Sequence, residues 1–249
     1  MTLLAGRRAL ITGGGSGLGA DLALRFADQG AEVWIAGRRP APLQATAARH
    51  PNIRTVTADI TDEAQVTAMF DTAGPCDIVI ANAGASESAP LTRTTLASWQ
   101  QMLDVNLTGT FLTLREAALR LKGQDWGRLI AVASTAGLKG YPYVSAYTAA
   151  KHGTIGLVKS AALEMVKTGI TVNALCPGFL DTEMTDHSVA NIMEKTGKTD
   201  AEARASLAAM SPQKRLIQPS EVSSAALWLC SPGSEGITGQ AISISGGET

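Results

Sequence analysis

The chain has 249 residues, of which 45% are hydrophobic and 17% charged, and its formal net charge is −1. This composition supports a sizeable core and excludes a disordered chain. The absence of a long basic run argues against nucleic-acid binding. The cysteines Cys76, Cys176 and Cys230 and the three histidines have no metal-ligand spacing, so we expect buried thiols with neither metal nor disulfide.

The sequence shows no targeting or membrane signal. The first residues, 1–8, lack the basic region, apolar region and cleavage site that make up a signal peptide. No apolar run approaches the ~20 residues that a membrane span requires. We therefore expect a cytoplasmic protein with no membrane partner.

Short apolar and β-branched runs alternate with longer helical patterns along the whole chain. Strands are predicted at 9–12, 32–36, 53–57, 77–81, 128–133, 170–175 and 241–244. Most are apolar throughout, which is typical of strands buried on both faces of a parallel sheet. Helices are predicted at 17–29, after the N-cap Asp62, and at 99–121, 145–168 and 219–229. This alternation predicts one α/β domain over 1–249, a doubly wound, parallel seven-stranded sheet of the Rossmann type.

Residues 181–215 depart from this alternation. They follow a predicted strand, carry polar and small residues, and contain one predicted short helix at about 199–209. A long excursion beyond the carboxyl end of a strand is a usual place for a ligand lid. We therefore expect a substrate lid at about 181–215.

A glycine-rich turn, Thr12-Gly-Gly-Gly-Ser-Gly-Leu-Gly19, lies between the first predicted strand and the first helix. Glycines let the backbone approach a pyrophosphate, whose charge is met by amides at the helix N-terminus. Residues 15–20 also satisfy G-x-G-x-x-A, but the spacing of Gly13, Gly17 and Gly19 fits better because Thr12 ends the strand. The placement predicts a dinucleotide site, and a flexible turn without ligand is the alternative.

The second predicted strand ends at Ala36-Gly37-Arg38-Arg39. A carboxylate at this point would bind the adenosine ribose of NAD, whereas an arginine accommodates the 2′-phosphate of NADP. Gly37 occupies the carboxylate position and Arg38 follows it, which favours NADP while leaving NAD open. Arginines at the start of a surface loop are also common without any ligand.

Tyr147 and Lys151 are one helical turn apart, and Ser134 follows a predicted strand. Positions i and i+4 share one helix face. A cation beside a tyrosine lowers the pKa of the phenol toward the working pH, and Ser134 could hydrogen-bond a substrate oxygen. The three residues together indicate proton transfer at an oxygen on carbon. Taken alone, such a pair is more often a half-buried aromatic with a snorkelling lysine than a catalytic pair.

In this combination the sequence resembles the short-chain dehydrogenase/reductase family in its single-domain form, over nearly all 249 residues. The turn 12–19 matches the family's T-G-x-x-x-G-x-G. Asn82-Ala-Gly84 matches N-N-A-G, except that Ala81 replaces the first asparagine. The family's catalytic residues match Asn106, Ser134, Tyr147 and Lys151, and its nicotinamide loop matches Pro177-Gly178.

The resemblance implies roles for these residues. Hydride passes between a nicotinamide cofactor and a carbonyl carbon while Tyr147 transfers the proton and Ser134 steadies the oxygen. Lys151 lowers the pKa of Tyr147 and binds the ribose, and Asn106 holds a water. The implied cofactor-binding residues are Gly13, Gly15, Ser16, Gly17, Leu18, Gly19, Arg38, Arg39, Asp59, Ile60, Asn82, Ala83, Gly84, Tyr147, Lys151, Pro177, Gly178 and Thr182. The implied assembly is a homotetramer.

Substrate identity rests on weaker signals. The segments 133–140, 149–156 and 170–178 most resemble 3-oxoacyl reductases and polyketide ketoreductases, which implies a β-keto thioester of coenzyme A or acyl carrier protein. Many other family members share them, so a catabolic secondary-alcohol dehydrogenase acting on a cyclic or hydroxyacyl substrate is the alternative. A non-catalytic NADP-binding regulator is a more remote one. Candidate substrate contacts, which packing or solvation could equally explain, are Leu138, Tyr141, Tyr143, Phe179, Met184 and His187.

Overall fold

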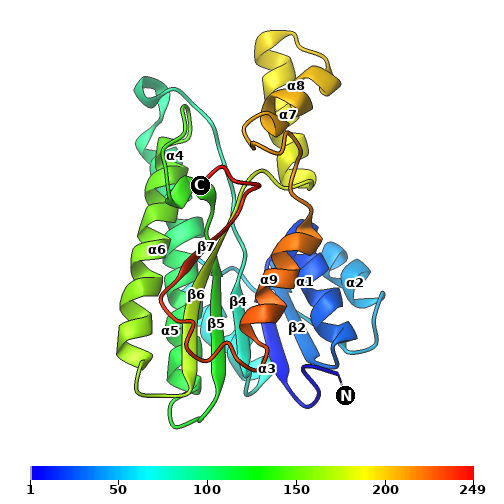
Figure 1. The fold of residues 1–249 in the computed structure, drawn as a ribbon, viewed down its shortest axis with the longest axis vertical. Helices are drawn as coiled ribbons and strands as arrows, with labels where there is room; N and C mark the ends of the chain where they lie inside the picture. Colours follow the sequence, from blue (N-terminus) through cyan, green and yellow to red (C-terminus); the bar gives the residue numbers. More distant parts are fainter. Residues whose placement is uncertain (1) are drawn as a thin grey trace.

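The computed structural model describes residues 2–249, and its centre is one seven-stranded sheet with the order β3-β2-β1-β4-β5-β6-β7 (Figure 1). Every paired strand is parallel to its neighbour, which confirms the predicted sheet. The order reverses between β1 and β4, and open α/β sheets bind ligands beyond the carboxyl ends of the strands at such a point. The strands are β1 (Arg8–Thr12), β2 (Glu32–Gly37), β3 (Ile53–Thr57), β4 (Ile78–Ala81), β5 (Gly127–Val132), β6 (Ile170–Pro177) and β7 (Ala241–Ile244).

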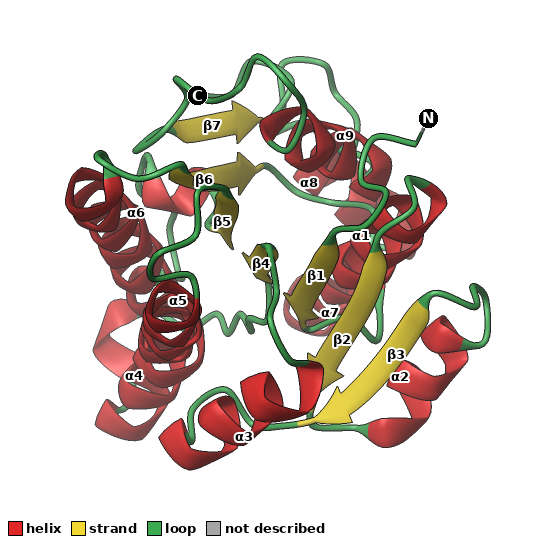
Figure 2. Ribbon diagram, turned by 90° about the horizontal axis from the view of Figure 1, so that it is seen from below, coloured by secondary structure: helices red, strands yellow, loops and turns green. Residues whose placement is uncertain are grey.

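Helices cover both faces of the sheet (Figure 2). One face carries α1 (Gly17–Asp28), α2 (Pro40–Ala47) and α9 (Pro219–Leu229). The other carries α3 (Glu63–Ala73), α4 (Leu96–Leu103), α5 (Gly109–Arg120) and α6 (Ser145–Met165). Two further helices, α7 (Glu183–Thr196) and α8 (Asp200–Ala208), rise beyond the ends of the strands (Figure 1). Across residues 2–249, no helix combines the length and apolar character needed to cross a membrane.

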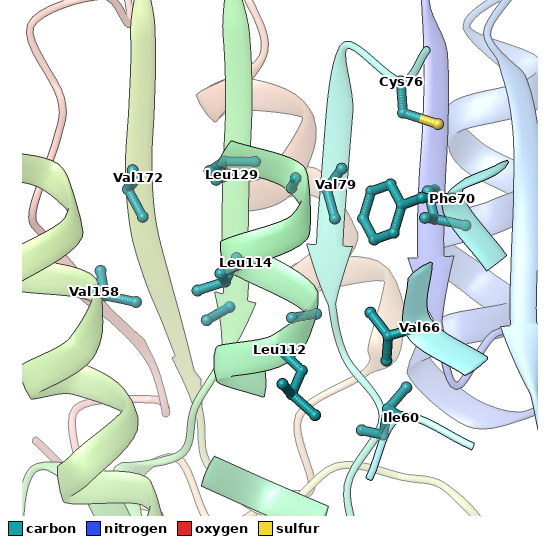
Figure 3. Close-up of a cluster of buried hydrophobic side chains, with 14 of the residues drawn as sticks. Ile60, Val66, Phe70, Cys76, Val79, Leu112, Leu114, Leu129, Val158 and Val172 are labelled. Atoms are coloured by element: carbon teal, nitrogen blue, oxygen red, sulfur yellow. The ribbon is translucent and has the colours of Figure 1, made fainter. Parts of the chain in front are cut away.

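A continuous apolar core fills the space between the sheet and α3, α5 and α6 (Figure 3). Val79 and Leu129 on the strands meet Phe70, Leu114 and Val158 on the helices, and each of these side chains is at most 3% exposed. Full burial of such a side chain contributes roughly 1.5–3 kcal/mol. This packing holds the strand ends, and therefore the site above them, in fixed positions.

The helix predicted at 99–121 is interrupted, and this correction concerns a predicted catalytic residue. A π-helical segment, η2 (Asp104–Thr108), separates α4 from α5. The Asn106 side chain donates from Nδ2 to the Met102 carbonyl at 3.0 Å, so it competes for an acceptor of the helical ladder. Such bulges in helices occur frequently at functional sites.

The structure contains two helices that the sequence pattern did not predict, α2 and α7. Both bury few side chains: only Leu43 and Thr46 in α2, and only Thr185 and Val189 in α7. Without a continuous apolar stripe, their helical period is hard to see in the sequence. By contrast, α8 corresponds to the predicted short helix, and a Thr199–Glu202 capping box begins it.

Candidate active site

A cavity of about 1080 Å³ lies beyond the carboxyl ends of the strands. Its walls come from the glycine turn after β1, the ends of β2 to β6, and α7. All four predicted catalytic residues and every predicted cofactor-binding residue line it. Of the predicted substrate contacts, Tyr141, Tyr143, Phe179, Met184 and His187 line it, and Leu138 does not.

The glycine turn presses the start of α1 against the end of β1. A Cβ atom on Gly19 would lie 2.1 Å from the Gly13 carbonyl oxygen, so only glycine fits there. Gly13 itself has φ +69°. Ser16, the N-cap of α1, makes no side-chain cap hydrogen bond, and Ser16, Gly17 and Leu18 line the cavity. The first amides of α1 therefore have no side-chain partner in the cap and suit a pyrophosphate, so the turn fits a nicotinamide dinucleotide.

Asn82 braces this turn from β4. Its Nδ2 donates to the Thr12 carbonyl at 2.8 Å and to the Gly13 carbonyl at 3.3 Å. In return, the backbone amides of Asn82 and Ala83 donate to the Thr12 hydroxyl. The Asn82 side chain therefore stabilises the cofactor cradle through the backbone of the turn.

The predicted adenosine end of the cavity carries one carboxylate and two arginines. Gly37 ends β2, and Gly37, Arg38 and Arg39 all line the cavity. The Arg38 side chain is 70% exposed, and its Nη1 lies 4.0 Å from Asp59 Oδ2. An exposed ion pair at this distance is worth little, so the guanidinium is free to meet a phosphate.

Ser134 and Tyr147 are two of the predicted catalytic residues, and both line the cavity. Ser134 leaves β5 in an extended conformation, and its Oγ accepts a hydrogen bond from the Ala136 amide at 3.1 Å. Burial raises the pKa of Tyr147, and a hydrogen bond from Ser134 opposes this effect. The direction is contrary to the lowered pKa that the sequence predicts. In this structure the cost of burying a phenolate exceeds the effect of the neighbouring groups.

Lys151 explains this difference. Its side chain is buried, its Nζ donates to the Val132 carbonyl at 2.8 Å, and it lies 5.6 Å from the centroid of the Tyr147 ring. Burial lowers the pKa of Lys151 to about 8. The ammonium thus contacts the ring face and a carbonyl, and it carries an unfavourable charge that an anionic partner would relieve.

Asn106 connects the π-helical segment with the loop after β4. It is fully buried, and its side chain exchanges two hydrogen bonds with the Ala85 backbone, at 2.8 and 3.2 Å. Its own carbonyl accepts hydrogen bonds from the hydroxyls of Thr110 and Thr154, each at 3.0 Å. A Cβ on Gly84 would lie 2.9 Å from Asn106 Oδ1 and 3.7 Å from Lys151 Nζ. Asn106 therefore holds the loop close to Lys151, and the predicted water contact stays a prediction.

The substrate end is mostly apolar. Tyr141 and Phe179 pack edge to face, with ring centroids 6.3 Å apart. Tyr143 is 65% exposed at the rim, and Leu138, at 38% exposed, points to no part of the cavity. Sequence reasoning missed further lining residues, among them Val144, Ser188, Asn191, Ile192, Lys195 and Met210.

Four of these six residues, Ser188, Asn191, Ile192 and Lys195, lie on α7. Met184, Ser188, Asn191 and Lys195 recur every three or four residues, so they form one helix face toward the cavity. Recognition of α7 as a helix would have found them. Asn191 Nδ2 donates to the Ser88 hydroxyl at 2.7 Å, which ties α7 to the loop after β4 on the opposite wall.

Comparison with known proteins places the chain among oxidoreductases. A family model described as enoyl-(acyl carrier protein) reductase matches residues 13–249. The cis-4-hydroxycyclohexanecarboxylate dehydrogenase of Sinomonas cyclohexanicum is 36% identical, covering 98% of this chain and 96% of the relative. A D-beta-hydroxybutyrate dehydrogenase of Cupriavidus necator is 34% identical, covering 98% of each chain. The solved structure of an actinorhodin polyketide ketoreductase variant with NADPH is 31% identical and covers 97% of each chain, with a TM-score of 0.92. These matches along the whole chain, with the seven-stranded sheet and the serine, tyrosine and lysine at one cavity, show that the chain belongs to the short-chain dehydrogenase/reductase family of oxidoreductases.

Proposed function

We propose that the protein is an NADPH-dependent reductase of a 3-oxoacyl thioester carried on coenzyme A or acyl carrier protein. The observation that carries this proposal is the arrangement of Ser134, Tyr147 and Lys151 around one cavity that also contains the glycine turn. The similarity to a polyketide ketoreductase supports the reaction and the substrate class.

The chemistry follows from the groups in the cavity. The nicotinamide cofactor, when bound, supplies hydride to the carbonyl carbon. Ser134 donates a hydrogen bond to the carbonyl oxygen, and Tyr147 gives that oxygen its proton. With a pKa of about 8, Lys151 is protonated at neutral pH and stabilises the tyrosinate that remains.

The alternative is a dehydrogenase of a cyclic secondary alcohol, which the relative from Sinomonas cyclohexanicum favours. The apolar wall around Tyr141 and Phe179 suits a ring as well as an acyl chain. The lid expected at about 181–215 would close over either substrate, and in this proposal α7 and α8 form it.

A substrate screen separates these functions. NADPH oxidation would be followed with acetoacetyl-CoA, with 4-oxocyclohexanecarboxylate, and with crotonyl-CoA as a carbon–carbon double-bond control. We expect turnover of acetoacetyl-CoA and none of crotonyl-CoA. Turnover of the cyclic ketone alone would favour the alternative, and NADPH binding without any turnover would favour a regulator.

Cofactor preference is tested at Arg38. We expect Arg38→Ala to raise the KM for NADPH about tenfold or more, because hydrogen bonds to a charged group contribute roughly 1.5–3 kcal/mol. The KM for NADH should change less than about twofold, since NADH lacks the 2′-phosphate. Arg93→Ala, at an exposed position on η1 (Leu91–Arg93) outside the cavity, is the control. Equal effects on both cofactors would contradict the phosphate-binding role of Arg38.

The homotetramer implied by the family resemblance stays a prediction. Exposed apolar side chains on α5 and α6, namely Phe111, Leu119 and Leu163, could pack against a second copy. Sedimentation velocity at micromolar concentration measures the assembly, and a monomer would contradict it.

A further inference from the structure

Glu248, close to the end of the chain, buries its carboxylate behind the substrate wall. The side chain is 2% exposed, and Oε1 lies 3.0 Å from Lys139 Nζ and 2.6 Å from the Tyr141 hydroxyl. A buried carboxylate is tolerated only when it is paired and hydrogen-bonded. Glu248 meets both conditions with two groups of the loop between β5 and α6.

The backbone around Glu248 is also fixed. Gly246 and Gly247 have φ +64° and +88°, so the chain turns sharply after β7. The amides of Glu248 and Thr249 then donate to the Ser245 hydroxyl, at 3.2 and 3.3 Å. The chain ends at the same edge of the sheet as α7 (Figure 1), so the tail reaches the cavity wall without spanning the sheet.

The contact with Glu248 determines which hydrogen bonds the Tyr141 hydroxyl can make. A carboxylate only accepts hydrogen bonds, so Tyr141 donates to Glu248 and its oxygen can accept from the Thr135 hydroxyl at 2.7 Å. Protein groups therefore occupy the hydroxyl on both sides. What remains for a substrate is the ring, which packs edge to face against Phe179 on the cavity wall.

Glu248 contacts two segments of the cavity wall. Thr135 directly follows Ser134 and is buried, so the hydrogen-bonded row from Glu248 through Tyr141 ends beside the reactive serine. A Cβ on Gly178 would lie 3.4 Å from Glu248 Oε2, which places the carboxylate beside the Pro177-Gly178 loop. One carboxylate thus contacts two walls of the same cavity.

We propose that Glu248 is a positioning residue for substrate binding: it holds the Tyr141 hydroxyl so that the ring forms a fixed apolar wall beside Ser134. This inference rests on the proposed ketone reduction. Because the wall contacts the substrate equally in the ground state and the transition state, losing it should raise KM and leave kcat nearly unchanged. A tail that served only to anchor the chain end would change thermal stability and neither kinetic constant.

The kinetic test uses Glu248→Ala, Tyr141→Phe and the double variant, with acetoacetyl-CoA and 4-oxocyclohexanecarboxylate as probes. We expect Glu248→Ala to raise the KM of the better probe about fivefold with kcat within about twofold. The double variant should be no worse than Glu248→Ala, because both changes remove the same contact. Glu248→Gln, which can still accept the hydrogen bond, should restore KM to within about twofold. Glu164→Ala removes an exposed carboxylate on α6 outside the cavity, and it is the control expected to leave both constants unchanged.

A second measurement needs no turnover. The chain has three tyrosines, so absorbance at alkaline pH follows the phenols, and Tyr141→Phe identifies the step that belongs to Tyr141. Burial first, and then Glu248, raise the pKa of Tyr141, while Thr135 lowers it and Tyr147 adds a smaller rise. Lys139 also faces the ring, at 5.0 Å. Glu248→Ala should therefore move the Tyr141 step to lower pH.

The two measurements separate the possible failures. The positioning role would be overturned if Glu248→Ala left the pH of the Tyr141 titration step unchanged. It would also be overturned if the increases in KM caused by Glu248→Ala and Tyr141→Phe multiplied in the double variant. A fall in Tm with unchanged KM would reduce Glu248 to an anchor of the chain end and would also overturn it. If the wild type reduces neither probe, the proposed function is wrong, and the tyrosine titration still decides whether Glu248 holds Tyr141.

Discussion

Tyr147→Phe should lower kcat about 10³-fold, within the range of roughly 10² to 10⁴ for general acid catalysis. Phenylalanine keeps the ring that packs in the site and removes only the hydroxyl that supplies the proton. The affinity for NADPH should stay within about twofold, since the glycine turn and Arg38 bind the other end of the cofactor. NADPH oxidation at saturating substrate measures kcat, and the fluorescence of bound NADPH measures affinity.

The matched control removes a hydroxyl from the same helix at an exposed position. Ser160→Ala lies on α6 outside the cavity, and it should retain full activity. A Tyr147→Phe enzyme that keeps more than about a tenth of the wild-type kcat would show that another group donates the proton. If Tyr147→Phe lost NADPH binding together with activity, the cause would be damage to the site and not the loss of the general acid.

The positions of the strands and their parallel pairing could be predicted because their apolar runs are unambiguous. β6 is buried at every position from Ile170 to Pro177, and such a run fits a parallel sheet better than a surface strand. The prediction of one uninterrupted helix at 99–121 is wrong for a local reason. The Asn106 side chain donates a hydrogen bond to the Met102 carbonyl, which a backbone amide would otherwise use as its acceptor in the helix. The periodic pattern of apolar residues contains no sign of this side-chain hydrogen bond.

The residues predicted from motifs line one cavity. The glycine turn, Asn82, Ser134 and the Pro177-Gly178 loop each follow a strand at the same edge of the sheet. Asn106 reaches this edge from η2, and Tyr147 and Lys151 reach it from α6. Contacts between distant segments were beyond the sequence. Tyr141 and Glu248 are 107 positions apart and Asn191 and Ser88 are 103 apart, and no spacing rule connects such pairs. Leu138 was wrongly expected in the cavity because a loop sequence does not show which way a side chain points.

The sign of the Tyr147 pKa shift also required the structure. The spacing of Tyr147 and Lys151 predicts a lowered pKa, whereas burial raises it. Helical spacing establishes that the two residues share a face, but it does not show that the ammonium donates to the Val132 carbonyl. Burial of the charged Lys151 side chain therefore destabilises the folded protein.

Because burial of this charge destabilises the fold, removing the charge should change both stability and activity. Lys151→Met is expected to raise the free energy of unfolding at pH 7 by roughly 1–3 kcal/mol and to lower kcat at least about 10²-fold. The fall of the lysine pKa from 10.5 to about 8 corresponds to roughly 3 kcal/mol of unfavourable charge burial. Loss of the hydrogen bond to Val132 offsets about 1 kcal/mol. Methionine has a similar shape and no charge, so it should pack in the same space.

The dependence on pH identifies the cause. Because burial lowers the pKa of Lys151 in the folded state, its penalty is complete below about pH 8 and disappears as pH rises to 10.5. The stability of the wild type should therefore approach that of Lys151→Met over this interval, as measured by urea unfolding. Lys159→Met, at an exposed position on the same helix, should show neither the gain nor the convergence. A Lys151→Met protein less stable than the wild type at pH 7 would mean that the contacts of the ammonium outweigh its burial, and Lys151 would then stabilise the fold as well as serving the reaction.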